Sequence, residues 1–232
     1  MAPASAAEGL DEASPAPSYI EIASRVRGSG PPPRRNIFDL ARRAYTCGLS
    51  HGHFDKPYLS VIDYSLPSNE RRLWVIDMRS GDVLFHEYVA HGRNTGLNEA
   101  RAFSNVLGSK QSSLGLFRTK GTYRGQHGYS LNLEGLERGV NHLAYERRIV
   151  MHGAEYVGDD FVKVHGRTGR SWGCPAVDRA VNRPIIDTIK DGSAVFAYYP
   201  DLDWLDSSTF LDCDGIAASG LDGADEAPNA GR

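Results

Sequence analysis

The stretch Arg148-Ile149-Val150-Met151-His152-Gly153 is the most informative part of this chain, together with Ser171-Trp172-Gly173-Cys174-Pro175, which follows after a gap of 17 residues. The apolar run before the histidine predicts a buried strand that ends on His152. Cys174 is one of only three cysteines and lies between a glycine and a proline. A cysteine attacks carbonyls as its thiolate, which a nearby base or the positive end of a helix must stabilise. The two stretches therefore predict a nucleophile, Cys174, with His152 as its general base.

The residues after the cysteine predict a helix from Asp178 to Lys190, because apolar side chains recur there at roughly helical spacing. This helix would begin a few residues after Cys174, so its dipole would favour the thiolate. Gly173 lacks a Cβ, which would let the backbone N–H groups of Gly173 and Cys174 approach a developing oxyanion.

These residues resemble the signature of a known family. A His-Gly pair followed by Ser-x-Gly-Cys is similar to the motif of the L,D-transpeptidases, the YkuD-type catalytic domain that cross-links peptidoglycan stem peptides through a cysteine acyl-enzyme. The resemblance implies a mainly β fold with a few helices, a YkuD-like β-sandwich or barrel in a single catalytic domain, and no cofactor. It spans roughly residues 37 to 200 and is carried by further segments at 63–68, 72–77, 103–105, 112–115 and 127–131.

The sequence departs from the family pattern around the cysteine. Trp172 stands where the family usually has a second histidine, and Pro175-Ala176-Val177 follows the cysteine, where an Arg or Asn two residues on is usual. His152 precedes Cys174 by 174 − 152 = 22 residues, which is longer than the usual spacing. The added residues include a second histidine, His165, at 174 − 165 = 9 residues before the cysteine. Histidine suits a base near neutral pH, so His165 is the alternative base.

Other residues near the motif are candidates for binding the substrate. The resemblance places His127 and Tyr129 in the substrate groove. Arg167 and Arg170 precede the nucleophile, and an arginine there would either bind a stem-peptide carboxylate with both nitrogens or remain a solvated surface residue.

Three further residues have simpler expected roles. Ser171 belongs to the motif itself, and Trp172 would stack or pack beside the cysteine. His91 also precedes a glycine, but this arrangement is more typical of a histidine that caps a strand or bonds the backbone.

Two other functions compete with transpeptidation. A zinc site of His152, His165 and Cys174 would lack the closely spaced Cys-x-x-Cys or His-x-x-x-His pairs that usually supply such ligands, so we expect no metal. A wall-binding domain that has lost catalysis would have no chemical reason to keep the motif residues together.

The motif leaves the exact reaction open. The standard family reaction joins the third residue of one stem to the third residue of another, and a branch of the family joins the first-position L-alanine to diaminopimelate. The changes at Trp172 and Pro175 and the longer gap indicate a reshaped donor cleft, which favours the first-to-third link. Water in place of the acceptor amine would make the same site an L,D-carboxypeptidase or endopeptidase. The stiff segment Pro31-Pro32-Pro33 would act as a spacer or lie across the mouth of the groove.

The composition limits the classes of partner. The 232 residues are 41% hydrophobic and 24% charged, with a net charge of −3, which is typical of one globular domain with tails. This balance gives no electrostatic case for nucleic acid. No apolar run reaches the roughly 18 residues that a membrane span needs. We expect a monomer whose partners are muropeptides.

The expected location follows from the reaction rather than from a targeting signal. The first residues, Met1 to Ala7, show no positively charged region followed by an apolar one, so no signal peptide is visible. A peptidoglycan enzyme works in the periplasm or cell envelope, so we expect a natural leader that this sequence lacks. The alternative is a cytosolic protein without a leader.

The chain divides into three expected parts. Residues 1–36 are a Pro-rich, disordered segment, residues 37–206 the catalytic domain, and residues 207–232 a largely flexible tail. Within the domain, strands are expected at 58–63, 72–77, 83–90, 115–119, 130–133, 148–152 and 194–199. Helices are expected at 37–45, 141–146, 159–164 and 178–190, the first capped by Asn36 and stopped by Gly48.

Cys47 and Cys213 are the two cysteines outside the motif. In an oxidising envelope they would pair and staple the ends of the domain together. They would equally remain two separate thiols, because the sequence does not show that their Cα atoms lie within bonding range.

Overall fold

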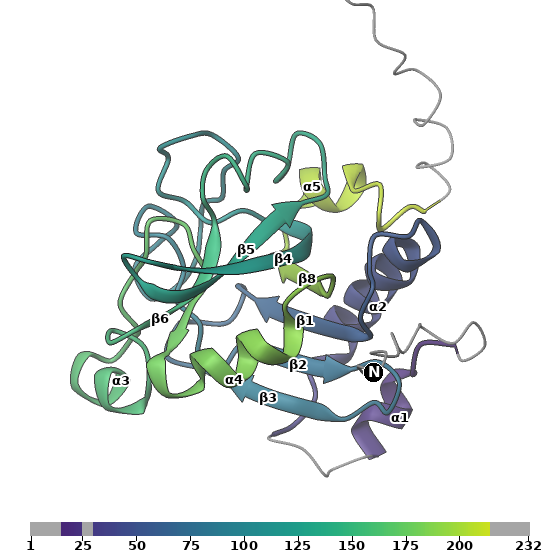
Figure 1. The fold of residues 1–232 in the computed structure, drawn as a ribbon, viewed down its shortest axis with the longest axis horizontal. Helices are drawn as coiled ribbons and strands as arrows, with labels where there is room; N and C mark the ends of the chain where they lie inside the picture. The colour runs from purple at the N-terminus through teal and green to yellow at the C-terminus, as the bar shows by residue number, and fades with distance from the viewer. Residues whose placement is uncertain (1–14, 25–29, 214–232) are drawn as a thin grey trace, which may run out of the picture.

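The protein is built around one eight-stranded sheet, as a computed structural model that describes residues 15–24 and 30–213 shows (Figure 1). The strand order is β3-β2-β1-β8-β4-β5-β6-β7. Neighbouring strands are antiparallel except for the pairs β1–β8 and β6–β7, which are parallel. The strands are β1 (Tyr58–Asp63), β2 (Leu73–Asp77), β3 (Val83–Glu87), β4 (Gly115–Gly125), β5 (Gly128–Gly135), β6 (Val150–Ala154), β7 (Ala176–Asp178) and β8 (Ala194–Tyr198).

The two ends of the sheet approach each other. The chain that follows β3 meets β7 through an isolated bridge between Ala90 and Ala176, and a second bridge joins Gly92 to Ser171. The sheet is therefore a nearly closed barrel. The expectation of a β-rich, barrel-like single domain with few helices is confirmed. Closure also brings residues 90–93 beside the segment that carries the candidate nucleophile.

Five helices are present in the described residues, and two of them complete the core. They are α1 (Tyr19–Ser24), α2 (Arg35–Ser50), α3 (Asp159–His165), α4 (Arg179–Ile189) and α5 (Leu202–Ser207). Helix α2 packs on β1 and β8, and α4 packs on β5, β6 and β7 (Figure 1). Apolar residues at helical spacing explain α2, since Ile37, Phe38, Ala41 and Ala44 form one buried stripe. Helix α4 begins where predicted, because the carboxylate of Asp178 accepts a hydrogen bond from the Ala180 N–H at 2.9 Å.

The boundaries predicted for α2 are wrong at both ends. Arg34, directly after Pro33, is the N-terminal capping position, so Asn36 lies inside the helix. Gly48 is also helical and does not stop the helix. A Cβ at Gly48 would meet the Phe54 ring at 2.4 Å, so the glycine is there for close packing.

The helix predicted at 141–146 is absent, and residues 138–148 form successive turns instead. The side chain of Asn141 donates hydrogen bonds to the carbonyls of Leu114 and Leu116 at 2.9 and 3.0 Å and accepts one from the Glu137 N–H. These bonds to sheet backbone compete with a helix. The short strand β7 was missed, and β3 ends at Glu87, earlier than residue 90.

Both termini are more structured than predicted where the structure describes them. Residues 19–24, expected to be disordered, form α1, and Ile22 is buried against the core. The Pro31 carbonyl accepts a hydrogen bond from the Trp74 ring N–H at 2.8 Å, which attaches this segment to β2. Phe210 and Leu211 are buried although the tail was expected to be flexible. The predictions for residues 1–14 and 214–232 lie outside the described residues, and the domain boundaries stay predictions.

A disulfide joins Cys47 on α2 to Cys213, with a Cα–Cα distance of 5.6 Å and 166 residues between them in sequence. The sequence left open whether these cysteines pair or remain separate thiols, and in the structure they are paired. Among the helices of the described residues, none is both long and apolar enough to span a bilayer.

Candidate active site

The loop from Ser171 to Cys174 is held in a shape that only glycine allows at its third position. Gly173 has φ of 125°, and a Cβ there would lie 2.7 Å from the Gln111 carbonyl oxygen. The Ser171 hydroxyl accepts from the Gly173 N–H at 3.1 Å and donates to the Cys174 carbonyl at 2.6 Å. Ser171 therefore shapes the backbone around the cysteine. Trp172, at 70% exposure, projects from the same loop and is not packed in the core.

The Cys174 thiol lies against the backbone at the start of β6. Its sulfur accepts a hydrogen bond from the Val150 N–H at 3.4 Å, and the thiol donates to the Arg148 carbonyl at 3.6 Å. The thiol is the one free cysteine among the described residues and is partly exposed. Burial raises the pKa of Cys174, whereas the Val150 N–H and the positive charge of Arg147 lower it. The expected helix dipole is missing from this balance, because β7 separates the thiol from α4.

His152 lies on β6, opposite Ser130 on β5 and Ala176 on β7. Its Nδ1 is 3.1 Å from the Gly153 carbonyl oxygen, so Nδ1 carries the proton and Nε2 is left to accept one. Burial lowers the pKa of His152, with a further lowering from His127, so the ring is held neutral. The His127 ring stacks on it at a centroid distance of 4.4 Å.

The strand pairing brings the loop of the thiol beside the strand of the imidazole. His152 pairs with Ala176, two residues after Cys174, and the thiol bonds the N–H of Val150, two residues before His152. Leu131, Met151 and Val177 belong to the core, and Met151 projects from the face of β6 opposite to His152. Among the described residues no hydrogen bond joins the thiol to His152 directly. Such bonds often tighten only when substrate is bound.

A basic, aromatic pocket of about 310 Å³ adjoins the thiol loop through Trp172. Arg170 is fixed in it by bonds to the carbonyls of Arg93 and Gly96 at 2.9 and 3.2 Å. Arg167 bonds the Thr168 carbonyl at 2.8 Å. Within the described part of the chain, none of the three pocket arginines forms an ion pair, so their charge is available to an anionic ligand. The pocket is lined by Arg93, Tyr156, Phe161, Arg167, Gly169, Arg170 and Trp172.

A second pocket, of about 500 Å³, adjoins the thiol through Arg148, whose carbonyl the thiol contacts. It contains aromatic, amide and charged side chains from β4, β5 and the turns before β6. They are Tyr123, Asn132, Tyr145, Glu146 and Arg148. Each of the two pockets thus includes one residue next to the thiol, Trp172 in the first and Arg148 in the second.

Two residues predicted for the site lie elsewhere. Tyr129 projects from the face of β5 opposite to Ser130, and its hydroxyl donates to Asp187 of α4 at 2.7 Å. His165 ends α3, where its ring packs on Phe161 at 4.1 Å. Neither contacts the thiol among the described contacts.

His91 has the structural role that its sequence context favoured. It is fully buried, and its Nδ1 accepts a hydrogen bond from Arg72 at 2.8 Å. Burial lowers the pKa of His91 to about 3, so the ring is neutral. Its carbonyl in turn accepts from the Ser171 N–H at 3.0 Å, which ties this buried pair to the cysteine loop.

Arg147 and Ser112 also support the same loop, although neither was predicted for the site. The Ser112 hydroxyl donates to the Gly173 carbonyl at 3.1 Å and accepts from the Gly92 N–H at 3.0 Å. Ser112 belongs to one of the segments that carry the family resemblance, which was the available signal. Arg147 had none, because its contacts are 34 to 43 residues away in sequence.

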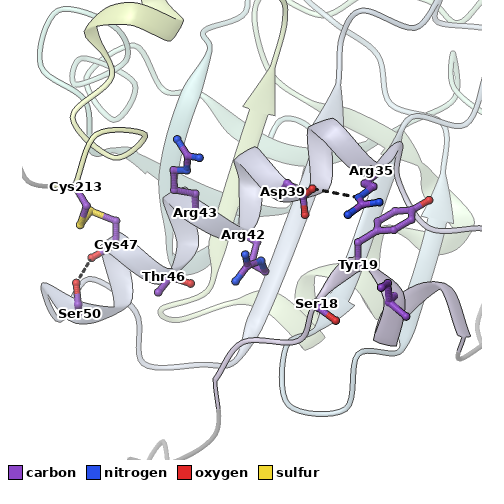
Figure 2. Close-up of a pocket in the computed structure, with 11 residues that line it drawn as sticks. Ser18, Tyr19, Arg35, Asp39, Arg42, Arg43, Thr46, Cys47, Ser50 and Cys213 are labelled. Carbon is purple, nitrogen blue, oxygen red and sulfur yellow. Dashed lines mark hydrogen bonds and ion pairs between the residues drawn. A yellow bond between two sulfur atoms is a disulfide. The ribbon is translucent and has the colours of Figure 1, made fainter.

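A pocket of about 620 Å³, larger than the two near the thiol loop, lies between α1 and the exposed face of α2 (Figure 2). Three arginines of α2 line it, and the disulfide of Cys47 and Cys213 lies at one end (Figure 2). These cysteines and His51 are the group of described residues close enough to share a metal ion, but their sulfurs are joined to each other.

Comparison with known proteins agrees with the fold and the motif. The family described as L,D-transpeptidase catalytic domain matches residues 33–198, well over half of the chain. A comparison with curated proteins gave no match. Among solved structures, an L,D-transpeptidase from Mycobacterium smegmatis is 12% identical, with 62% of this chain and 59% of that one covered and a TM-score of 0.39. The helical cell shape determining protein Pgp2 from Campylobacter jejuni is also 12% identical, with 64% and 50% covered and a TM-score of 0.42.

The chain thus spans less than two thirds of the length of these two structures. The family match, by contrast, runs from the residue before the cap of α2 to the end of β8. It includes both halves of the motif and the whole sheet. The chain belongs to the family of L,D-transpeptidase catalytic domains.

Proposed function

We propose that this chain is a peptidoglycan L,D-transpeptidase that links stem peptides through an acyl-enzyme on Cys174. The observation that carries the proposal is the position of the thiol. The thiol bonds the backbone of β6 two residues before a neutral histidine, and Trp172 and Arg148 next to it line two separate pockets. Transpeptidation needs two substrates at one nucleophile, an acyl donor and an amine acceptor, and two pockets suit that requirement.

In the proposed mechanism His152 removes the thiol proton through Nε2, while the Gly153 carbonyl holds Nδ1–H. For this step the thiol turns from the Val150 N–H toward the imidazole. The thiolate attacks a donor carbonyl that follows an L-centre, and the C–S bond forms. The C–N bond then breaks, and the leaving amine takes the proton from the imidazolium. The acceptor amine attacks the thioester, returns a proton to His152 and frees the thiolate.

The oxyanion would be stabilised by backbone N–H groups, but the two proposed donors are not equivalent. The Gly173 N–H already donates to the Ser171 hydroxyl at 3.1 Å. The Gly173 N–H can stabilise the oxyanion only if it gives up its hydrogen bond to the Ser171 hydroxyl. The Cys174 N–H is therefore the principal donor in this proposal.

The basic pocket is the proposed binding site for stem-peptide carboxylates. Arg170 is already oriented by two backbone carbonyls, so less side-chain entropy is lost when it binds a carboxylate. Arg167 adds a second guanidinium, and the exposed Trp172 ring forms a wall beside the cysteine. His127 covers His152 and would contact the donor near the reacting carbonyl. We leave Tyr129 out of the substrate site, and His165 out of the base role, because of their placement.

We further propose that the link is first-to-third, from L-alanine to diaminopimelate. The exposed Trp172 in place of the usual histidine supports a reshaped donor cleft. The third-to-third link and hydrolysis of stem peptides are the alternative reactions, and an inactive wall-binding domain is the alternative without catalysis. The proposed activity places the protein in the periplasm or cell envelope, as a monomer that acts in cell wall biogenesis and thereby in cell shape.

Mass spectrometry of products from tetrapeptide and pentapeptide muropeptides tests the proposal. We expect a cross-linked dimer that has lost the donor peptide beyond L-alanine, and Cys174→Ala should form none. Loss of only the terminal D-alanine from a tetrapeptide donor would contradict the first-to-third link. Full activity in Cys174→Ala would end the whole proposal. The variant should fold, because replacing one small, partly exposed side chain costs about 1 kcal/mol or less.

A further inference from the structure

Arg147 lies in the turns before β6 and is half-buried, yet none of its bonds goes to a carboxylate. Its guanidinium donates to the Ser113 hydroxyl at 2.5 Å and the Gln111 carbonyl at 2.6 Å. It also donates to the Ser109 hydroxyl at 3.1 Å and to the Ser104 carbonyl. Among the ion pairs of the described residues, Arg147 takes part in none. One side chain therefore fastens the segment 104–113 and keeps its positive charge uncompensated.

The segment that Arg147 fastens is the one that supports the cysteine loop. The Gln111 carbonyl accepts a hydrogen bond from Arg147. Its oxygen is so close to Gly173 that a Cβ on Gly173 would lie 2.7 Å from it. The next residue, Ser112, donates to the Gly173 carbonyl at 3.1 Å. On the other side, Arg147 directly precedes Arg148, whose carbonyl accepts the thiol hydrogen bond. Arg147 thus supports two segments that contact the cysteine loop, residues 104–113 and the backbone at Arg148.

The charge of Arg147 also acts on the thiol. Burial raises the pKa of Cys174, and Arg147 is the cation that lowers it; burial lowers the pKa of Arg147, and the thiolate raises it. The other titratable groups near the thiol are Tyr64 after β1, Tyr156 after β6 and His152, two residues after the Val150 N–H that bonds the sulfur. Burial raises the pKa of both tyrosines to about 12, so they are neutral near pH 7. The imidazole is neutral as well, since burial lowers its pKa. Near neutral pH, Arg147 is the charged group in this set.

We propose that Arg147 is a positioning residue for the nucleophile: it fixes the segment 104–113 against Gly173 and supplies the positive charge that stabilises the Cys174 thiolate. The inference rests on the proposed role of Cys174 as the nucleophile. Burial raises the pKa of the thiol, and loss of this charge would raise it further.

The test is the pH dependence of Cys174 alkylation by iodoacetamide in the unreduced protein, where the other two cysteines are paired. In Arg147→Gln we expect the midpoint of the rate profile to move up by about one pH unit, as for loss of a nearby opposite charge. In Arg147→Lys, which keeps the charge but not the forked geometry, the midpoint should stay close to that of the wild type while cross-linking is slower. Arg138→Gln is the matched control, because Arg138 is an exposed arginine in the same turns.

An unchanged midpoint in Arg147→Gln, or an equal shift in Arg138→Gln, would overturn the proposal. Thermal melting shows whether each variant is folded. If Arg147→Gln does not fold, Arg147→Lys decides alone, because a raised midpoint there contradicts the role of the charge. Alkylation needs no muropeptide, so the result stands apart from the proposed function. Cross-linking that survives in Cys174→Ala would refute that function, whatever the Arg147 profiles show.

Discussion

Two regions of this molecule contain a cysteine, a histidine and arginines, and they have become different kinds of structure. Near the end of α2, Cys47 is joined to Cys213 (Figure 2). His51 lies one helical turn after Cys47. Beside β6, Cys174 is unpaired, and it bonds the backbone two residues before His152. The α2 region also has the larger pocket, about 620 Å³ against about 310 and 500 Å³ beside the thiol.

The comparison shows that residue types and pocket size do not define a reactive site. His51 uses its Nδ1 on the Cys47 carbonyl at 2.9 Å, so it caps the end of α2. His152 uses the same atom on the Gly153 carbonyl, but its strand also contains the Val150 N–H that bonds the free thiol. The strand β6 and the glycine loop make the difference.

The largest expected difference between the two regions lies in their histidines. His152→Ala should lower kcat/KM for cross-linking by about 10²–10⁴-fold, the usual contribution of a general base. Burial lowers the pKa of His152 from its ordinary value of 6.5. The imidazole is therefore still unprotonated at pH 6.5 and can take the thiol proton. The acidic limb of the wild-type rate profile should therefore lie below pH 6.5.

His51→Ala is the control and should keep both the rate and the acidic limb. His165→Ala tests the alternative base in the same assay. If His165→Ala loses the activity and His152→Ala keeps it, the assignment of the base is wrong.

The second difference concerns stability. Replacing Cys47 and Cys213 together by serine should lower the free energy of unfolding by about 2–5 kcal/mol, because the bridge closes a very long loop. Cross-linking well below the melting temperature should persist. Denaturant unfolding measures the loss, and Cys174→Ser, expected within about 1 kcal/mol of the wild type, is the matched variant. Titration of the denatured, unreduced protein should find a single thiol; three thiols would contradict the disulfide.

The smallest expected effect, on KM, distinguishes the arginines of the basic pocket from those of the α2 pocket. Arg170→Met should raise KM for a stem peptide about tenfold, since a hydrogen bond to a charged group contributes about 1.5–3 kcal/mol. Arg42→Met, in the α2 pocket, should leave KM unchanged. Steady-state kinetics with one muropeptide donor measures both. Equal effects of the two substitutions would show that the basic pocket has no special part in binding.

The sequence predicted the parts of the fold and the site that depend on local patterns. The apolar stripe of α2, the helix after Asp178 and the strand that ends on His152 are all present. The predictions were wrong where contacts between residues distant in sequence determine the local structure. Residues 141–146 have no helix because Asn141 bonds carbonyls of β4 and of the residue before it.

The same distinction applies within the candidate site. The Cys174 and His152 motif is local and readable. Arg147 could not be found, since its partners lie in a separate loop. The bond from Tyr129 to Asp187 could not be foreseen either, because it depends on the strand register. The prediction that a helix begins close to Cys174 was wrong for a related reason. The strand β7 lies between them, and its three residues are too few to show a pattern in the sequence.

The near-closure of the sheet has a consequence for when the surroundings of the thiol are complete. The seam that closes the barrel joins Ala90 to Ala176, residues separated by 176 − 90 = 86 positions. Contacts so far apart in sequence require a large loop-closure entropy to be overcome before they form. Until the seam closes, the loop that contains Cys174 lacks its backbone hydrogen bonds to His91 and Arg93. The surroundings of the nucleophile are therefore complete only after contacts between distant parts of the sequence have formed.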